Sequence, residues 1–319
     1  MRARVLLILA GLYLALAGCS NAPPNCAIHP VTRLDFQEMG GLPIVEVQIN
    51  GRPVKMIVDT GAQRTLLTEA AAKRLDLPVD IGRFSQTVGV GGPTTEWDVK
   101  LDQLVVGGVR FPVERMAVSG FNIPSRDGDA PEGLLGADIL LGFDLDIDFS
   151  AGAITLYSAR RCQDAKPPWN VPVIAITAYR KQDRILIPLQ LDGVAARGLL
   201  DTGAEKTTLG SSLAERLGVT DGVMQPDPVV MQNGTGPSAV ESRLHRFRSL
   251  TIGPAVTLGP MLPVLSSDFG IGDALIGQDF LKGRRVWISF ATNLVFVTRL
   301  PGDAAIKPTA DPADLRVSR

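Results

Sequence analysis

The chain of 319 residues has few of the side chains on which many enzyme and nucleic-acid sites depend. It contains two histidines and three cysteines, 5% of its residues are aromatic, and its formal net charge is −1. Because no basic tract is present, a nucleic-acid partner has no electrostatic support. No His-x-x-x-His spacing or comparable ligand set occurs in the sequence, so we expect no metal site and no cofactor.

What the chain has is a long internal repeat. Asp59 and Asp201 each lie in an Asp-Thr-Gly-Ala phrase that follows an apolar run. The two copies share three aligned parts, which are residues 45–77 with 187–219, 134–140 with 275–281, and 145–156 with 286–297. Two copies of so long a unit indicate two paired lobes rather than a solenoid.

The duplicated carboxylates are the strongest candidates for hydrolytic chemistry. The histidines, His29 and His245, lie at non-equivalent places in the repeat, so a Ser-His triad has no repeated support. At close range, Asp59 and Asp201 cannot both ionise cheaply, so one would keep a proton while the other accepts a proton from an attacking water. Which aspartate has which role cannot be read from the sequence, because such a pair titrates as a unit.

The motifs resemble those of the retropepsin-like aspartic proteases. Each half has apolar-apolar-Asp-Thr-Gly-Ala, then a glycine-rich segment, then apolar-apolar-Gly before a short helix. The resemblance implies two retropepsin units fused in one chain, with an all-β fold of two homologous β-barrel lobes and short helices. It also implies an active site between the lobes, an extended peptide or protein substrate, and a monomer. The flap tyrosine of pepsin-like enzymes is missing.

The resemblance also assigns residues around the two aspartates. Thr60 and Thr202 would hydrogen-bond across to the opposite loop, and glycines would let the loops turn and pack closely. The carboxylates Asp138 and Asp279 are duplicated too, and their position before a short helix favours helix capping over catalysis. The residues expected to support the active-site loops are Thr60, Gly61, Thr65, Gly136, Thr202, Gly203, Thr207 and Gly277.

Two glycine-rich segments, residues 87–92 and 231–236, occupy the same place in the two halves. We interpret them as the tips of flap hairpins that bind substrate, with a plain surface turn as the alternative. Because Trp97 has no aromatic counterpart in the second half, we expect unequal flaps. The predicted flap residues are Gly89, Val90, Gly91, Gly92, Asn233, Gly234, Thr235 and Gly236.

Local patterns predict the elements that lead into each aspartate. Residues 44–49 and 185–191 alternate like strands, and Asn-Gly or Asp-Gly follows each run as a hairpin turn. Residues 68–75 and 211–217 have helical apolar spacing, with Thr68 and Ser211 as expected N-caps.

The N-terminus resembles a bacterial lipoprotein signal. A short apolar run ends in Leu-Ala-Gly-Cys, so we expect lipidation of Cys19 and a lipid anchor facing the periplasm, with Ser20 favouring the outer membrane. An ordinary cleaved signal is the alternative. In that oxidising compartment Cys26 and Cys162 would form a disulfide, with two free thiols as the alternative.

The expected organisation has five parts: a signal peptide at residues 1–18, lobes at 19–160 and 181–300, a linker at 161–180, and a disordered tail at 301–319. The function that best fits is an aspartic endopeptidase acting on periplasmic or envelope proteins. A non-catalytic peptide-binding lipoprotein of the same fold is the alternative.

Overall fold

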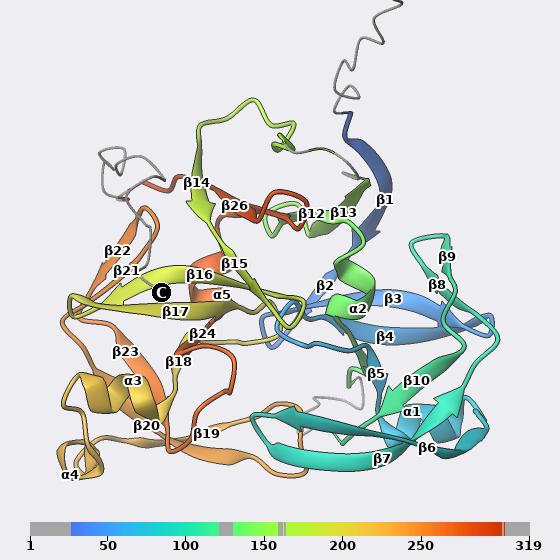
Figure 1. Ribbon diagram of the computed structural model, residues 1–319, viewed down its shortest axis with the longest axis horizontal. Helices are drawn as coiled ribbons and strands as arrows, with labels where there is room; N and C mark the ends of the chain where they lie inside the picture. The colour runs from blue at the N-terminus through green and yellow to red at the C-terminus, as the bar shows by residue number, and fades with distance from the viewer. Residues whose placement is uncertain (1–26, 121–129, 159–161, 163, 302, 304–319) are drawn as a thin grey trace, which may run out of the picture.

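The computed structural model describes residues 27–120, 130–158, 162, 164–301 and 303. The predicted signal peptide, Cys19, Cys26 and almost all of the predicted tail lie outside these residues. The fold is mostly β, with one lobe from each half of the chain and a third sheet joining them (Figure 1). The all-β, two-lobed architecture expected from the repeat is therefore confirmed.

The first lobe is a curled sheet, drawn blue to green in Figure 1. Its strands, in spatial order, are β6 (Val79–Gly89), β7 (Gly92–Lys100), β10 (Arg115–Val118), β5 (Leu66–Leu67), β11 (Gly133–Leu135), β4 (Arg52–Val58), β3 (Leu42–Ile49), β8 (Leu104–Val106) and β9 (Val109–Phe111), with β2 (Gln37–Met39) paired to β3. Its helices are α1 (Glu69–Arg74) and α2 (Ala137–Leu140).

The second lobe repeats this order strand for strand. Its strands are β19 (Val229–Gln232), β20 (Val240–Arg246), β23 (Met261–Leu265), β18 (Thr208–Leu209), β24 (Ala274–Ile276), β17 (Val194–Leu200), β16 (Arg184–Leu191), β21 (Ser249–Ile252) and β22 (Ala255–Leu258), with β15 (Tyr179–Lys181) paired to β16. Its helices are α3 (Ser211–Arg216), α4 (Asp221–Met224) and α5 (Gln278–Leu281).

In each lobe a tight hairpin carries the chain into the aspartate. The turns between β3 and β4 and between β16 and β17 have left-handed backbone at Asn50 (φ 51°) and Asp192 (φ 51°), each followed by a glycine with positive φ. Such turns match the twist of paired strands. The outgoing strands β4 and β17 are buried at their ends and pair in parallel with β11 and β24, so the apolar-apolar-Gly motif lies beside each aspartate loop.

A third sheet joins the lobes, and the third aligned part of the repeat, residues 145–156 with 286–297, builds its centre. Its strands, in order, are β1 (His29–Asp35), β13 (Ala153–Ser158), β12 (Asp144–Asp148), β25 (Arg285–Ser289), β26 (Leu294–Thr298) and β14 (Val173–Thr177). The duplicated strands β12 and β25 pair with one another, with Asp146 opposite Trp287. The two lobes are thus connected by continuous backbone hydrogen bonding.

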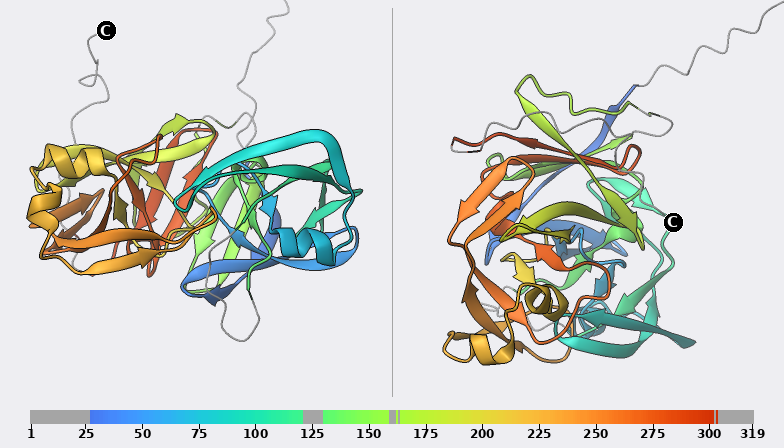
Figure 2. Two further views of the ribbon diagram at one scale, coloured as in Figure 1. Left: turned by 90° about the horizontal axis from the view of Figure 1, so that it is seen from below. Right: turned by 60° about the vertical axis from the view of Figure 1, so that its left-hand side comes forward.

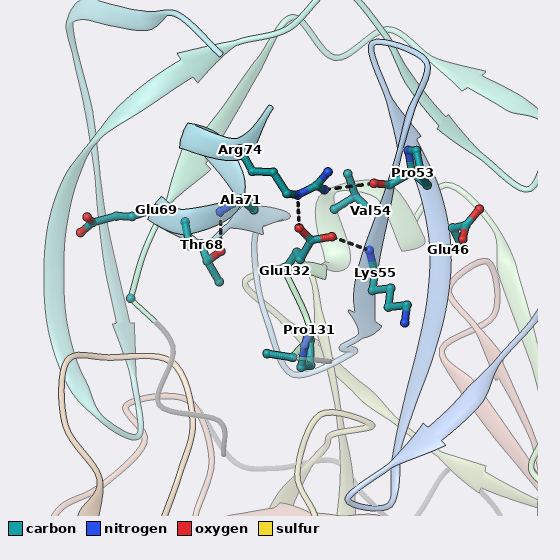
Figure 3. Close-up of a pocket in the computed structure, with 13 residues that line it drawn as sticks. Glu46, Pro53, Val54, Lys55, Thr68, Glu69, Ala71, Arg74, Pro131 and Glu132 are labelled. Carbon is teal, nitrogen blue, oxygen red and sulfur yellow. Dashed lines mark hydrogen bonds and ion pairs between the residues drawn. The ribbon is translucent and has the colours of Figure 1, made fainter. Parts of the chain in front are cut away.

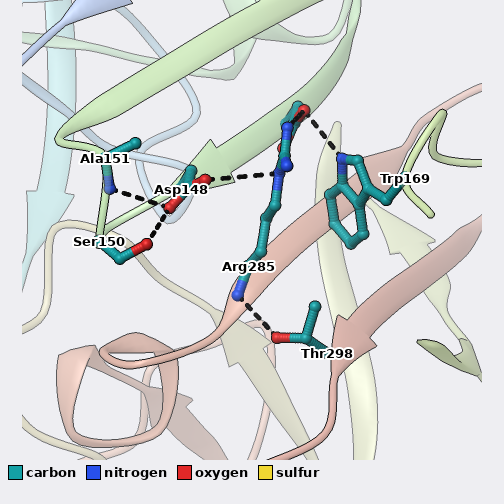
Figure 4. A network of polar contacts seen from close by, with 7 residues as sticks. Asp148, Ser150, Ala151, Trp169, Arg285 and Thr298 are labelled. Carbon is teal, nitrogen blue, oxygen red and sulfur yellow. Dashed lines mark hydrogen bonds and ion pairs between the residues drawn. The ribbon is translucent and has the colours of Figure 1, made fainter. Parts of the chain in front are cut away.

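An ion pair crosses the centre of the joining sheet. Arg285 donates from Nε and Nη2 to the two carboxylate oxygens of Asp146, at 2.8 and 2.7 Å, while the Trp169 indole donates to the same carboxylate at 3.0 Å. Figure 4 shows the Arg285 side chain between Asp148 and Trp169, and its guanidinium lies 4.7 Å from a ring centroid of Trp169. Because the Asp146 side chain is 1% exposed, Arg285 and Trp169 take the place of water as its hydrogen-bond donors.

We expect Arg285→Met to lower the free energy of unfolding by about 3 kcal/mol, because it leaves a buried carboxylate without its counterion. Urea denaturation of the purified protein measures this. Arg33→Met is the matched control, since the Arg33–Asp35 pair is exposed and such pairs contribute about 0.5 kcal/mol. Equal stability of the two variants would contradict the assigned role of Arg285.

Two local expectations need correction. The range 161–180, predicted as a linker, contains β14 and most of β15, because the alternating apolar residues of β14 pair with β26. Thr68 caps α1 as expected, accepting the Ala71 N–H at 3.0 Å. Ser211 does not cap α3; it is the first helical residue and follows Gly210.

Candidate active site

The two aspartates lie at equivalent turns directly after β4 and β17. Asp59 Oδ1 accepts hydrogen bonds from the N–H groups of Gly61 and Ala62, both at 2.8 Å. Asp201 Oδ1 accepts one, from Gly203 at 2.8 Å, while the Ala204 N–H donates to the backbone oxygen of Asp201 at 3.4 Å. Both carboxyl groups are therefore oriented by the turns that carry them, but Asp59 accepts one more backbone hydrogen bond than Asp201.

Threonines lock the two turns together across the lobes, the geometry that the family resemblance implies. The Thr60 hydroxyl donates to the Leu200 carbonyl at 2.7 Å, and the Thr202 hydroxyl donates to the Val58 carbonyl at 2.5 Å. Each hydroxyl also accepts the backbone N–H of the opposite threonine, at 3.0 and 3.1 Å. All four bonds are buried, so they fix the spacing of the turns.

The glycines of the two phrases bring each turn against the opposite carboxyl group. A Cβ at Gly203 would lie 2.6 Å from Asp59 Cγ, and one at Gly61 would overlap the carboxyl carbon of Asp201. Only glycine leaves room for this approach. The two carboxyl groups thus share one small space between the lobes.

Burial dominates the electrostatics of the pair. It raises the pKa of Asp201 well above its usual range, and the charge of Asp59 and the hydrogen bond between the two carboxyl groups raise it further. Burial also raises the pKa of Asp59, but the N–H groups of Ala62 and Gly61, the hydrogen bond with Asp201 and the nearby Arg184 all oppose it. The pKa of each carboxyl group is therefore raised, and the backbone favours the charged form more at Asp59, which has two N–H donors, than at Asp201, which has one.

A second layer beneath each turn consists of a threonine, an aspartate and a glycine. Thr65 donates from its hydroxyl and its N–H to Asp138 Oδ1, at 2.6 and 2.8 Å, and accepts the Gly136 N–H at 3.0 Å. The second lobe repeats this arrangement. Its bonds join Thr207 to Asp279, at 2.7 and 2.9 Å, and the Gly277 N–H to Thr207 at 3.3 Å.

These contacts extend our interpretation of the second pair of aspartates. Gly136 and Gly277 occupy the N-cap positions of α2 and α5, with no side-chain cap. Asp138 and Asp279 each accept the next backbone N–H in the first helical turn, at 3.0 and 3.1 Å, and they also accept hydrogen bonds from the loops that follow the catalytic candidates. A Cβ at Gly136 would also clash with the backbone of Arg64, at 2.6 Å, so close packing there requires glycine.

The predicted flap tips meet one another. Seen from below in Figure 2, the β6–β7 hairpin and the segment between β19 and β20 extend toward each other. The Gly91 N–H donates to Thr235 O at 2.9 Å, and the Gly236 N–H donates to Gly120 O at 3.0 Å. Added Cβ atoms at Gly89, Gly91 or Gly236 would overlap the opposite tip.

The two flaps are unequal in structure. In the first lobe Gly89 ends β6 and Gly92 begins β7, and Val90 packs against an apolar cluster of the second lobe that includes Ala204. In the second lobe Asn233, Gly234 and Thr235 belong to a longer connection between β19 and β20. A Cβ at Gly234 would make ordinary contact with Val90, at 3.4 Å.

Sequence reasoning missed two polar groups near the aspartates. Arg184 of the second lobe donates to the Gly61 carbonyl of the first, at 3.2 Å. Arg64 donates to the Ser85 hydroxyl at 2.6 Å, and Ser85 donates to the buried Asp98 at 2.5 Å, which ties an active-site loop to the first flap. Arg184 could have been noticed as a charged residue that aligns with an apolar residue, Leu42, in the other copy.

A separate hollow of about 700 Å³ lies between α1 and the β3–β4 hairpin, away from the aspartates. Figure 3 shows one ion pair in it, in which Arg74 donates to Glu132 at 2.5 Å, and Glu132 also accepts the backbone N–H of Lys55 at 3.3 Å. Gly120 and Ala130 at its edge flank residues outside the described part. Nothing in its lining points to a ligand.

Other features bear on the remaining expectations. Cys162 is buried and disulfide-bonded, and its partner lies outside the described residues. The pairing with Cys26 thus stays a prediction. Among the described residues no group of three or more His, Cys, Asp or Glu side chains is placed to hold a metal ion. No helix in the described ranges is long and apolar enough to cross a membrane.

Two β lobes that present a shared carboxyl pair on threonine-locked turns define the architecture of an aspartic protease. Residues 45–139 match a family model for aspartyl proteases, and residues 187–283 match one for the putative aspartyl protease of gag polyproteins. Both halves of the chain are therefore aspartyl-protease-like domains. This confirms the prediction of two retropepsin-like units in one chain.

Two solved structures are similar to the chain. Aspartic proteinase from Irpex lacteus has a TM-score of 0.49 and 14% identity, covering 85% of this chain and 97% of that one. A retropepsin-like aspartic protease from Rickettsia conorii has a TM-score of 0.32 and 22% identity, covering 40% of this chain and 91% of that one. No curated protein sequence matches the chain.

Proposed function

We propose that the protein is an aspartic endopeptidase in which Asp59 and Asp201 activate a water molecule. The observation that carries the proposal is the pair of carboxyl groups that the threonine-locked turns hold together, with two backbone N–H donors on Asp59 and one on Asp201. Asp59, which accepts two backbone N–H groups, is the ionised member and the general base. Asp201, whose pKa is raised more strongly, carries the proton.

These roles give a balanced reaction. Asp59 takes a proton from the water as its oxygen attacks the scissile carbonyl carbon, and Asp201 gives its proton to the carbonyl oxygen. The tetrahedral intermediate then collapses: Asp59 passes its proton to the leaving nitrogen, and the hydroxyl proton returns to Asp201. The carbon–nitrogen bond breaks, and the pair regains its one-proton state.

The substrate that fits is an extended peptide between the lobes and the flaps. The flap tips carry glycine N–H groups, at Gly91 and Gly236, that bond to the opposite tip or to Gly120 without substrate. A peptide backbone can accept the same donors once the tips separate, as a strand added to existing strands does. Apolar clusters beside Ala62 and Ala204 would contact its side chains.

The alternative is a peptide-binding protein without activity. The structure offers a specific argument against it. Holding two carboxyl groups together in a buried site is costly, and a binder gains nothing from that cost. Catalysis gains from it, because a closely spaced pair keeps one acid and one base at the same pH.

We also propose that the protein works as a monomer, anchored to the membrane through a lipid on Cys19 and facing the periplasm, with the outer membrane as its site. One chain supplies both aspartates, which supports a monomer. A disulfide at Cys162 supports an oxidising compartment, since disulfides persist there. Radiolabelled palmitate incorporation that is lost in Cys19→Ala tests the anchor.

Incubating the purified full-length protein with a peptide library tests the proposed activity. Cleaved products should appear, and a statine-type transition-state analogue should prevent them. Sedimentation should place the activity at the mass of one chain. Binding of peptides without any cleavage, over a range of acid to neutral pH, would favour the non-catalytic alternative.

The pH dependence follows from the raised pKa of both aspartates. The one-proton state exists between the two apparent pKa values of the pair; below them no base remains, and above them no acid. Because burial raises both from 3.8, we expect a bell-shaped profile of kcat/KM with both limbs above pH 3.8.

The alanines after each phrase provide a check on this profile. Ala62 and Ala204 offer no hydroxyl to the carboxylates, and serine at both positions would stabilise the ionised form. The alkaline limb should then move to lower pH. An optimum below pH 3.8, or an unmoved alkaline limb in a folded double variant, would contradict the account.

A further inference from the structure

One guanidinium reaches across the lobes to the turn that carries Asp59. Arg184 begins β16 in the second lobe, and its Nη1 donates to the Gly61 carbonyl at 3.2 Å while Nη2 donates to Gln182 Oε1 at 2.6 Å. The Gly61 N–H in turn donates to Asp59 Oδ1 at 2.8 Å. Arg184 therefore contacts the same short turn that orients the ionised carboxylate.

The charge of Arg184 has no other evident use. Its side chain is half-buried, and among the described residues its guanidinium donates to two uncharged oxygens, those of Gly61 and Gln182. Burial lowers the pKa of Arg184, whereas the charges of Asp201 and then Asp59 act in the opposite direction. Its Nε is buried without a hydrogen-bond partner. A half-buried cation is costly unless a nearby anion offsets it, and the carboxyl pair is that anion.

The contact exists on one side only. Leu42 begins β3 at the aligned position of the first lobe, and it is buried in an apolar cluster. No guanidinium therefore approaches the Asp201 turn from that position. This difference between the lobes parallels the difference in backbone donors, which number two for Asp59 and one for Asp201.

We propose that Arg184 is a positioning residue: from the second lobe it holds the Asp59 turn in place and supplies the positive charge that keeps one member of the carboxyl pair ionised. The inference rests on the proposed function. The charge acts on both carboxyl groups, so it favours the state in which the pair carries one negative charge, while the contact with Gly61 is made only to the Asp59 turn. The charged groups that act on the guanidinium are the carboxyl groups of Asp201 and Asp59.

Arg184→Leu, which introduces the residue of the other lobe, tests the inference. We expect kcat to fall about tenfold, as for loss of one charged hydrogen bond, with KM changed less than about threefold. The acid limb of the kcat/KM profile should move to higher pH, because ionising the first carboxyl is harder without the cation. Arg184→Lys should return the limb toward its wild-type position, since the charge remains.

Arg180→Leu is the matched control. Arg180 lies on the same hairpin, but its partner is the exposed Asp183, at 2.7 Å, so its loss should leave the profile unchanged. An acid limb that is the same in Arg184→Leu and wild type would overturn the proposal. So would an equal shift in Arg180→Leu. If Arg184→Leu does not fold, Arg184→Gln removes the charge and keeps a donor, and it should give the same shift.

A measurement without substrate separates this inference from the proposed function. Carboxyl ¹³C NMR of the free protein gives the apparent pKa values of the pair, and Arg184→Leu should raise the lower one. An unmoved value would overturn the role of Arg184 even if peptides are cleaved. Absence of cleavage by wild type, with the shift present, would instead refute the activity and leave the electrostatic role of Arg184 standing.

Discussion

Replacing either Asp59 or Asp201 with asparagine is expected to lower kcat/KM for peptide hydrolysis by about 10⁴-fold, the upper range for loss of a general acid or base. An amide at position 59 cannot take a proton from water. An amide at position 201 cannot give one to the carbonyl oxygen with the strength of a carboxylic acid. Because the two act as a unit, the double variant should be no less active than either single variant.

The same substitutions should not damage the fold. Asp201 is 8% exposed, and holding it beside a second carboxylate is unfavourable, so Asp201→Asn should melt at the same temperature as wild type or higher. Asp102→Asn, at an exposed turn, is the control and should leave the activity unchanged. Hydrolysis by either single variant within tenfold of wild type would show that the carboxyl pair is not the catalytic centre.

The parts of the fold that the sequence predicted are those set by local pattern or by the repeat. The hairpins before Asp59 and Asp201 follow from alternating apolar residues and from turns at Asn50 and Asp192 that tolerate left-handed backbone. The equivalence of the lobes follows from the alignment of the two halves. Neither requires knowledge of a distant contact.

The joining sheet could not be predicted in this way. The strands β12 and β25 are copies of one sequence block, and nothing in either copy states that it pairs with the other. The strand β14 falls within the predicted linker, because the prolines and the cysteine before it dominate the local pattern. Its partner β26 lies more than a hundred residues later, so only the assembled fold reveals the pairing.

The sequence predicts loop support for Thr65 and Gly136, but not the aspartate that joins them. Asp138 lies in the first turn of a short helix, and spacing alone favours a role at the helix start, but its oxygen also accepts from Thr65, 73 residues away. The duplication of both Asp138 and Thr65 in the second lobe was the signal that could have linked them. Arg184 could be found in a different way. It aligns with the apolar Leu42 of the other copy, and a position at which the two copies differ in chemistry is one where the two lobes can differ in role.

Gly203→Ala is expected to lower kcat/KM by at least about 100-fold, because a displacement of about 1 Å at a reacting group costs this much. The added Cβ would lie 2.6 Å from Asp59 Cγ, so either the carboxyl group or the turn must move. The threonine bonds resist movement of the turn. The carboxyl of Asp59 is therefore the group that shifts, and it leaves the position from which it can reach the water.

The effect should be on activity more than on stability, where overpacking costs about 1 to 3 kcal/mol. Gly222→Ala is the matched control in the same lobe, because its Cβ would meet only Thr220 Oγ1, at 3.9 Å, in the short helix α4. Measuring kcat/KM of the two variants with one peptide, together with their melting temperatures, tests this prediction. If Gly203→Ala kept activity within threefold of Gly222→Ala, the two carboxyl groups would not be held by the close approach of the turns, and the shared site between the lobes would have to be rebuilt on other contacts.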